Sequence, residues 1–596
     1  MPKILMVGSA SLDILIINDQ PVSSAGGAGM YTAMAAHRAG ANVSMFGLRP
    51  EPVPEVLAPM QIRLEEWLGP VVALDQMPHF TIRHQGDQAE YLDFKIGAES
   101  LMDPEDLPDD LSSFDGIHVI PLGDSEVQRR FLLACRERGA RFLSAGTFLG
   151  DIREKPQAVR RVMEIADAFF MNEEEAVCIF GSLENAQTQP GKLLFITLGR
   201  GGVLVLQGLH GIHVPATPAA VVDPTGAGDT FCGAALAGVL SGAHPVMAAL
   251  VASLLAAREV EAVGPTALFD DGFSLDLPID PRVTLDDPQI SMISEVLKTV
   301  TEASPFDFTG SDFPPAGHPA ALDFFFVSTL QQFSFWEEKD GAYSQPMIAP
   351  LDGADLKGSS YLFHSYLRPL IKDPDFFSPA RQANLTPEEL LAVYRSDDGA
   401  DPMPAFDLHL RQARLFGQDL LDLQLTPQSI LTQANASDSP LKTFLMLLDR
   451  VAGYKEDPLR KKSTLLALIL NQRPEAFLRI KPDETPKPVV DYHAMRSALR
   501  TGMVRISDPE LEQMIATRRL VNPDEEWAVR FAVYRAQEKV AELSGKSIGA
   551  VDWFFFNYMR SRCLEMSEPL CEKCALNAVC AKRKHLFQPV IRTTFY

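Results

Sequence analysis

Two stretches of the sequence hold residues whose types and spacing could do chemistry. The first, DPTGAGDTFCG at residues 223–233, places Gly226, Ala227 and Gly228 directly before Asp229. A strand-like AAVV precedes it and a helix of small residues follows, so the glycines fall at a helix N-terminus, where backbone N–H groups attract phosphate. Asp229 is then placed to take a proton from an attacking hydroxyl. A tight strand-to-helix turn that needs glycine is the alternative interpretation.

The second stretch holds four of the seven cysteines. Cys563, Cys571, Cys574 and Cys580 have seven, two and five residues between them. Four thiolates so close in sequence can converge on one metal centre, and zinc or an iron–sulfur cluster would both fit these ligands. Disulfides are not expected in a reducing compartment. The remaining cysteines lie in apolar surroundings and are expected to be reduced core residues: Cys135, Cys178 and Cys232.

Length and composition set broad limits. The chain has 596 residues, room for roughly two to four domains. Its net charge of -24 argues against a surface that coats nucleic acid, because phosphate binding needs Lys and Arg. The apolar run ILMVGSASLDILI at residues 4–16 is interrupted by Asp13, which predicts one buried strand and no signal peptide. No run of 18 or more apolar residues predicts a membrane span, so we expect a cytoplasmic protein.

The pattern of secondary structure changes along the chain. Residues 1–268 alternate short β-rich runs with helical segments, which predicts a doubly wound, mostly parallel α/β sheet with helices on both faces. Within them, residues 79–97 predict two strands around a Gly86–Asp87 turn, a small β lid. Residues 269–320 are rich in Pro, Asp and Gly and predict a linker with the first helix of the next domain. Residues 321–596 have helical periodicity and predict a mostly α-helical domain.

Four motifs in residues 1–268 resemble those of the PfkB family of ribokinase-like carbohydrate kinases. DPTGAGDTF is similar to the C-terminal signature of that family, and SAGGAGMYTAMAAHRAGANVSMFG, from Ser24, to its N-terminal signature. NEEE, from Asn172, and TLGRGG, from Thr197, resemble its magnesium motif and its nucleotide loop. The resemblance implies that ATP and Mg²⁺ are bound and that Asp229 is the catalytic base beside an anion hole at Gly226, Ala227 and Gly228. It further implies substrate contacts by Asp13, Gly26 and Gly27, and nucleotide or magnesium contacts by Asn172, Glu175, Thr197, Gly199 and Gly202.

Two departures from the family pattern bear on the substrate. Tyr31 stands where the family usually has a substrate-contacting Asn, and LRPEPVPE follows SMFG in place of the usual Gly-x-Asp-x-x-Gly. An aromatic ring at the sugar site suits a flat group such as a base better than a bare sugar. We therefore expect Tyr31 to contact a nucleoside or sugar substrate, and a degraded kinase is the alternative.

The C-terminal half shows two further resemblances. PVVDYHAMRSALRTG, from Pro488, resembles the segment around the catalytic Asp of the helix–hairpin–helix DNA glycosylases, whose endonuclease III branch carries a C-terminal [4Fe–4S] loop with spacing six, two, five. That resemblance favours [4Fe–4S] over zinc for the loop at residues 563–580. Several segments across residues 285–596, including KKSTLLALI and VVDYHAMRSALRTGMVRISDPELEQMI, resemble the queuosine-salvage nucleoside glycosylases, which release a deazaguanine base. This half is therefore expected to have a glycosylase-like fold.

The chemistry of N-glycosidic cleavage selects candidate residues in this half. Asp491 could stabilise an oxocarbenium ion or activate water, and its alternative role is an ordinary helix cap. Asp397, with Asp398, could hold ribose hydroxyls or form a solvated turn. Phe335 and Trp336 could stack on a base or belong to the core. Lys461 and Lys462 lie near the position of a catalytic lysine in some glycosylases, and we expect them at a solvated helix start.

Taken together, the sequence predicts a kinase fused to a nucleoside glycosylase in a salvage route, acting on a small sugar or nucleoside. The kinase would phosphorylate the nucleoside and the second domain would cleave the product, or the two steps would run in the reverse order. The alternative is a nucleic-acid-binding or DNA-repair protein with a degenerate kinase as sensor, which the acidic chain disfavours. No membrane partner is expected, and a homodimer stays open.

Overall fold

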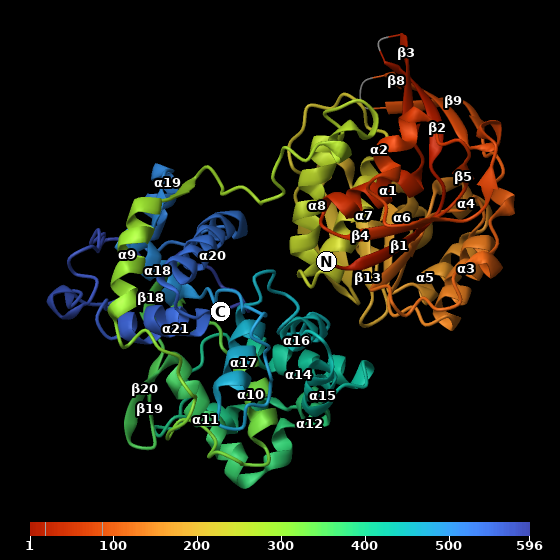
Figure 1. Cartoon of the computed structure of the whole chain (residues 1–596). Coiled ribbons are helices and arrows are strands. Elements are labelled where there is room, and N and C mark those ends of the chain that lie inside the picture. The colour runs from red at the N-terminus through yellow and green to blue at the C-terminus, as the bar shows by residue number, and fades with distance from the viewer. Residues whose placement is uncertain (18, 86–87) are drawn as a thin grey trace. The chain divides into compact units, whose positions relative to one another are not determined.

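The computed structural model describes residues 1–17, 19–85 and 88–596. The chain divides into two compact units, Met1–Leu277 and Pro278–Tyr596, each with its own elements (Figure 1). The Gly86–Asp87 turn predicted for the lid lies outside the described residues.

A nine-stranded sheet forms the centre of the first unit. Its order is β15-β14-β13-β12-β11-β10-β1-β4-β6, and all neighbours from β13 to β6 are parallel. Buried apolar residues fill the central strands, which requires helices on both faces. The predicted mostly parallel α/β sheet is confirmed. The strands are β1 Lys3–Val7, β4 Asn42–Phe46, β6 Trp67–Leu68, β10 Gly116–Val119, β11 Leu143–Gly146, β12 Ala168–Asn172, β13 Leu193–Thr197, β14 Val203–Gln207 and β15 His210–Val214.

The connections of this sheet run in two directions. From β1 the chain moves through α1 (Ala28–Arg38) to β4, whereas from β10 it moves the opposite way through α3 (Ser125–Glu137), α5 (Pro156–Ile165) and α6 (Glu173–Phe180) to β13. Right-handed crossovers therefore place α1 and the α3–α5–α6 group on opposite faces. The direction reverses between β1 and β10, and ligands bind beside the carboxyl ends of strands at such a reversal.

A second, four-stranded sheet carries the predicted lid. Its order is β3-β2-β8-β9, with β3 at Gln20–Gly26, β2 at Ser11–Ile17, β8 at His79–Gln85 and β9 at Gln88–Lys95. The prediction of one strand over residues 4–16 is wrong. Strand β1 ends at Val7, before Gly8 with φ +155, and the chain then enters the smaller sheet at Ser11.

The second unit is mostly helical, as predicted, with two β-hairpins that the sequence analysis missed. The hairpins are β17–β18 (Trp336–Lys339, Ala342–Pro346) and β19–β20 (Ile348–Leu351, Ala354–Lys357), and each turns at an Asp-Gly pair with positive φ at both residues. Its helices are α9 Asp287–Thr299, α10 Ala321–Leu330, α11 Gly358–Lys372, α12 Pro379–Ala383, α13 Pro387–Tyr394, α14 Phe406–Asp422, α15 Pro427–Ala436, α16 Pro440–Leu448, α17 Lys461–Gln472, α18 Tyr492–Thr501, α19 Pro509–Ala516, α20 Pro523–Ser544 and α21 Ile548–Trp553.

A buried ion pair joins α20 to the segment just before α17. Arg530 of α20 donates to both carboxylate oxygens of Asp457 at 2.8 and 2.7 Å, and both side chains are almost fully buried. Asp457 also accepts the backbone N–H of Lys461 at 2.7 Å, which fixes the start of α17. Burial alone would raise the pKa of Asp457, but Arg530 and these hydrogen bonds hold it below its ordinary value.

Loss of the Asp457 charge should therefore weaken the second unit. We expect Asp457→Asn to lower the free energy of unfolding by about 3–5 kcal/mol, because Arg530 would stay buried without a counter-charge. Urea unfolding followed by tryptophan fluorescence measures this, since Trp336, Trp527 and Trp553 lie in this unit and only Trp67 in the other. Glu295→Gln, which breaks an exposed pair with Lys298, is the control and should cost less than about 1 kcal/mol. Equal losses in the two variants would contradict the assigned role.

Candidate active sites

The sequence DPTGAGDTFCG leads through a turn into a helix, and the AAVV segment before it is not the strand that we expected. Gly226 is the N-cap of α7 (Ala227–Leu240), in the left-handed conformation with φ +79, which favours glycine. The first turn of a helix has N–H groups without helical acceptors, and its dipole is positive at that end. Asp229 lies in this first turn, where burial raises its pKa to about 6. The anion-hole candidates and the candidate base are therefore adjacent.

Glycine near the N-terminus leaves room for a second buried carboxylate, that of Asp13. A Cβ on Gly26 would lie 1.7 Å from an Asp13 carboxylate oxygen, so only glycine leaves room for that side chain. Gly27 follows as the N-cap of α1 with φ +87. Asp13 is 5% exposed, and burial raises its pKa to about 6. The charges of Asp13 and Asp229 both act on Tyr31, which places the two signatures at one site.

Tyr31 does not have the position that we predicted for it. Its ring is 2% exposed and packs against Gly226, where an added Cβ would lie 2.4 Å from the ring. The expectation of a ring that contacts a flat substrate group is therefore wrong, since the ring is enclosed and supports the loop. An exposed ring comes instead from the lid, where Tyr91 is 60% exposed and meets Phe80 edge-on at 6.1 Å. Desolvation and the negative charges of Asp229, Asp13 and Asp223 raise the pKa of Tyr91.

One carboxylate holds the loop itself in place. Asp223 accepts the backbone N–H groups of Thr225 at 2.9 Å and Gly264 at 2.8 Å. Nearby, Glu259 is fully buried, and burial followed by the charges of Asp223 and Asp229 raises its pKa well above the ordinary value. The sequence analysis missed Glu259, whose only signal is an acid in the apolar helix α8 (Pro245–Glu259).

The nucleotide and magnesium candidates lie at neighbouring strand ends. Asn172 ends β12 and Thr197 ends β13, and the two residues are paired in the sheet. Asn172 and Glu175 form a reciprocal capping box at 2.9 and 2.8 Å, which is a sufficient structural role for both. Burial, and then the charge of Asp229, raises the pKa of Glu175 to about 7, so this acid lies in the field of the candidate base. Two further candidates, with positive φ, shape the turn after Thr197: Gly199 and Gly202.

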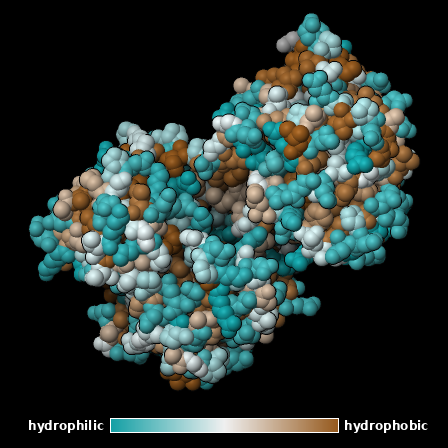
Figure 2. Space-filling view, viewed as in Figure 1, coloured by the Kyte–Doolittle hydropathy of each residue, from teal (hydrophilic) through white to brown (hydrophobic). Residues whose placement is uncertain are grey.

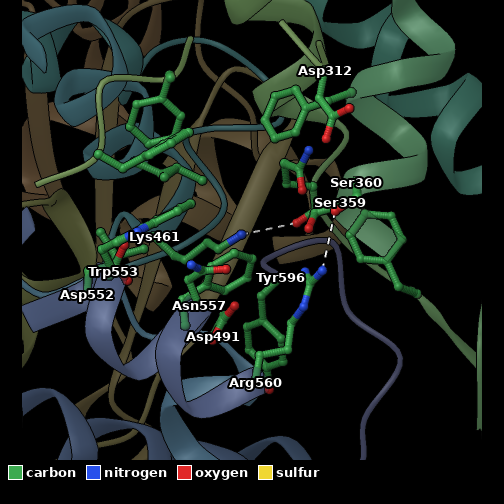
Figure 3. Close-up of a pocket in the computed structure, with 18 of the residues that line it drawn as sticks. Asp312, Ser359, Ser360, Lys461, Asp491, Asp552, Trp553, Asn557, Arg560 and Tyr596 are labelled. Atoms are coloured by element: carbon green, nitrogen blue, oxygen red, sulfur yellow. Dashed lines mark hydrogen bonds between the residues drawn. The ribbon is translucent and has the colours of Figure 1, made fainter. Parts of the chain in front are cut away.

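The second unit contains a pocket of about 210 Å³ (Figure 3). Aromatic rings form much of its wall, and Phe306 stacks on Trp553 with ring centroids 4.2 Å apart. Three ionisable groups converge there from separate elements. They are Lys461 from α17, Asp491 from the start of α18, and Asp552 from α21. The other lining residues are Phe308, Asp312, Phe313, Gln332, Phe335, Ser359, Ser360, Phe363, Leu465, Val489, Tyr492, Phe556, Asn557, Arg560 and Tyr596.

Asp491 is a helix cap that also lines the pocket. One of its oxygens accepts the Ala494 N–H at 2.9 Å, so it caps α18, and its side chain also lines the pocket. It is 8% exposed.

The prediction of a solvated helix start for Lys461 and Lys462 is wrong. Their exposures are 5% and 2%, because α17 begins inside the unit beside Asp457. The Lys461 ammonium donates to the Gln332 carbonyl at 3.3 Å at the pocket wall. Lys462 donates to the Leu330 carbonyl at 2.9 Å, and burial lowers its pKa to about 7.

Two other substrate candidates, Trp336 and Asp397, lie outside the pocket. Trp336 is 1% exposed and stacks on Tyr343 in the core, so the prediction that it contacts a base is wrong. Phe335, its neighbour, does line the pocket. Asp397 accepts the backbone N–H groups of Asp352 and Gly353 at 3.1 and 2.9 Å, so it holds the β19–β20 turn and does not line the pocket.

The structure places the cysteine loop against α18. The buried Arg500 side chain donates to Cys563 Sγ at 3.5 Å, and its carbonyl accepts from Cys580 Sγ at 3.7 Å. Cys574 donates its N–H to the Cys571 carbonyl at 3.0 Å. Among the described residues, no group of three or more His, Cys, Asp or Glu is arranged to hold a metal ion, so the predicted cluster has no support from this geometry. Of the other cysteines, Cys178 is exposed, which corrects its assignment to the core.

Comparison with known proteins assigns part of the first unit. Residues 114–271 match the model of the pfkB family carbohydrate kinases. This segment is a PfkB family kinase domain. The PfkB domain region is similar to a cytidine kinase of Thermococcus kodakarensis, 26% identical over 269 residues, which cover 44% of this chain and 96% of that protein. It is also similar to a fructokinase of Klebsiella pneumoniae, 33% identical over 188 residues, which cover 28% of this chain and 61% of that protein.

Solved structures of several kinases resemble the same part of the chain. A nucleoside kinase of Burkholderia thailandensis, in complex with inosine, has a TM-score of 0.39 at 21% identity and covers 44% of this chain and 92% of its own. A ribokinase of Cryptococcus neoformans, in complex with ADP, has a TM-score of 0.39 at 19% identity and covers 45% of this chain and 96% of its own.

Hydrophilic and hydrophobic residues are interspersed over the face of the molecule seen in Figure 2. Among the residues that the structure describes, no helix is both long enough and apolar enough to cross a membrane.

Proposed function

We propose that the first unit transfers a phosphoryl group from ATP to a hydroxyl of a sugar or nucleoside. The observation that carries this proposal is the position of Asp229, in the first turn of α7 directly after the left-handed Gly226. The match of residues 114–271 to the PfkB model and the likeness to a cytidine kinase and a fructokinase support it.

In this proposal, each group has one task. Asp13 holds substrate hydroxyls, and Asp229 takes the proton of the attacking hydroxyl. The N–H groups of residues 226–228 and the α7 dipole stabilise the charge on the transferred group. Bound Mg²⁺ would neutralise the negative charge of the phosphates, and the buried acid Glu175, beside Asn172, would hold it. The exposed Tyr91 ring suits a substrate with an aromatic base, which favours a nucleoside.

Asp229→Asn should lower ATP turnover by about 10²–10⁴-fold, the usual contribution of a positioned base. The wild-type rate should rise with pH through about 6, because the base acts only when ionised and burial raises its pKa to about 6. ADP formation with a panel of sugars and nucleosides measures both effects. Glu126→Gln, in the first turn of α3, removes an exposed helix-start carboxylate and should leave the rate unchanged. Undiminished turnover in Asp229→Asn would mean that another group is the base.

We also propose that the second unit cleaves an N-glycosidic bond and releases a purine-like or deazapurine base. The specific observation is Asp491 at the wall of an aromatic pocket, together with Lys461. Cleavage builds positive charge on the sugar carbon, and a carboxylate held close to that carbon stabilises it. The flat walls would stack on the base.

Asp491→Asn should abolish base release and leave the melting temperature near the wild-type value, because Asn is as good an N-cap as Asp. Release is measured by chromatography after incubation with guanosine, 7-deazaguanosine and their 5′-phosphates. Asp508→Asn makes the same change at the N-cap of α19, which does not line the pocket, and is the matched control. Melting of Asp491→Asn far below Asp508→Asn would favour a purely structural role.

We retain the [4Fe–4S] cluster, with zinc as the alternative, as a proposal for Cys563, Cys571, Cys574 and Cys580. Cys563 and Cys580 both contact Arg500. Burial, and to a smaller extent the electrostatic interaction with the other three cysteines, raises the pKa of Cys580. Such a cluster would cross-link a polar loop too short for a core of its own. Four thiolate ligands would leave no site open for a substrate.

Anaerobically purified protein should be brown and hold about four irons per chain. Cys574→Ser should bleach it and destabilise the second unit, while ATP turnover by the first unit stays nearly unchanged. Cys178→Ser, at an exposed cysteine, is the control and should keep the colour. Colourless protein with one zinc per chain would contradict the cluster.

A further inference from the structure

Asp552 is an ionisable group of the pocket that no sequence motif indicated. It lies two residues before a π-helical turn at Phe554–Tyr558, and Phe556 and Asn557 of that turn line the same pocket. Single π-helical turns within helices are frequent at functional sites. The negative charge of Asp491 and the positive charge of Lys461 both act on Asp552, so the three groups lie close together (Figure 3).

The two carboxyl groups have opposite surroundings. Asp491 accepts the Ala494 backbone N–H at the N-terminus of α18. Among the described residues no N–H or O–H donates to the Asp552 carboxyl, and burial followed by the charge of Asp491 raises its pKa well above the ordinary value, against the opposing effect of Lys461. Two carboxyl groups whose environments differ in this way divide into an acid and a base.

The position of Asp552 also suits a proton donor to the base of a nucleoside. It directly precedes Trp553, whose ring stacks on Phe306 in the aromatic wall, where a flat base would bind. Asp491 and Lys461 lie beside it, away from solvent. A departing purine needs a proton on nitrogen, because the unprotonated anion is a poor leaving group.

We propose that Asp552 is the general acid of base release, paired with Asp491. The inference rests on the proposed N-glycosidic activity of this unit. The bond from the sugar carbon to the base nitrogen breaks, its electron pair goes to nitrogen, and nitrogen takes the proton of Asp552. Water adds through oxygen to the sugar carbon and gives a proton to Asp491. The products are the free base and the free sugar, and proton exchange with solvent restores both carboxyl groups.

The test compares two leaving groups in the full-length protein. Asp552→Asn should lower base release from guanosine or 7-deazaguanosine by about 10²–10⁴-fold. It should leave cleavage of 4-nitrophenyl β-ribofuranoside near the wild-type rate, because nitrophenolate leaves without a proton. Asp491→Asn should lose both reactions. Asp323→Asn is the control, since Asp323 is another acid whose pKa burial raises, to about 6, but it does not line the pocket.

The pH profile gives a second readout that a structural role would not move. Wild-type release from a nucleoside should fall at high pH as Asp552 loses its proton, and this limb should be absent with the nitrophenyl substrate. The charged or titratable groups that face Asp552 are Asp491 from α18 and Lys461 from α17, and the pocket also holds Asp312, Arg560, Tyr492 and Tyr596. Lys461→Met tests whether the fall in rate at high pH comes from the lysine. We expect this variant to keep the fall.

Three outcomes would overturn the inference. Asp552→Asn could keep wild-type rates on nucleosides, or it could lose both substrates while melting like the wild type, which would exclude a role as acid. Wild-type protein that cleaves neither substrate would remove the proposed glycosidic activity itself, and the inference with it. If Asp552→Asn folds poorly, Asp552→Ser replaces it in the same comparison, and Asp552→Glu should recover part of the nucleoside rate.

Discussion

The two candidate sites depend on the same constraint, the placement of a carboxylate out of water at the N-terminus of a helix. Burial penalises the charged form, whereas the helix dipole and free N–H groups favour it. In the first unit this constraint places Asp229 in the first turn of α7, and in the second it makes Asp491 the cap of α18. Glycine leaves room for this arrangement in the first unit, and aromatic rings enclose it in the second.

Neighbouring residues hold these carboxylates and the groups beside them in position. In the first unit, the absence of a side chain at Gly26 admits Asp13, and the Tyr31 ring fills the space behind Gly226. In the second, the buried pair of Arg530 and Asp457 fixes the start of α17 and so the position of the Lys461 ammonium. The structural ion pair and the pocket lysine are therefore linked, because Asp457 binds both Arg530 and the backbone N–H of Lys461.

The sequence predicted the parallel sheet and the helical unit because their apolar periodicity is strong, and it made Asp229 a candidate because this residue lies in the last of four ordered motifs. It misjudged residues 4–16, since an apolar run does not reveal a chain that changes sheets at Gly8. Lys461 and Trp336 were misplaced because burial of a lysine or an indole is a property of tertiary packing. Asp552 carried only a weak signal, a lone acid in an apolar run, whose meaning depends on the distant Asp491.

The central claim is that one chain carries two chemically independent sites. The most direct measurement follows ADP and free base in the same reaction of ATP, Mg²⁺ and a nucleoside, by chromatography and mass spectrometry, in wild type, Asp229→Asn and Asp491→Asn. The account predicts that Asp491→Asn still forms ADP and a phosphorylated nucleoside, whereas Asp229→Asn still releases base from a substrate supplied as its 5′-phosphate. Loss of both products in either variant, with the melting temperature unchanged, would contradict it.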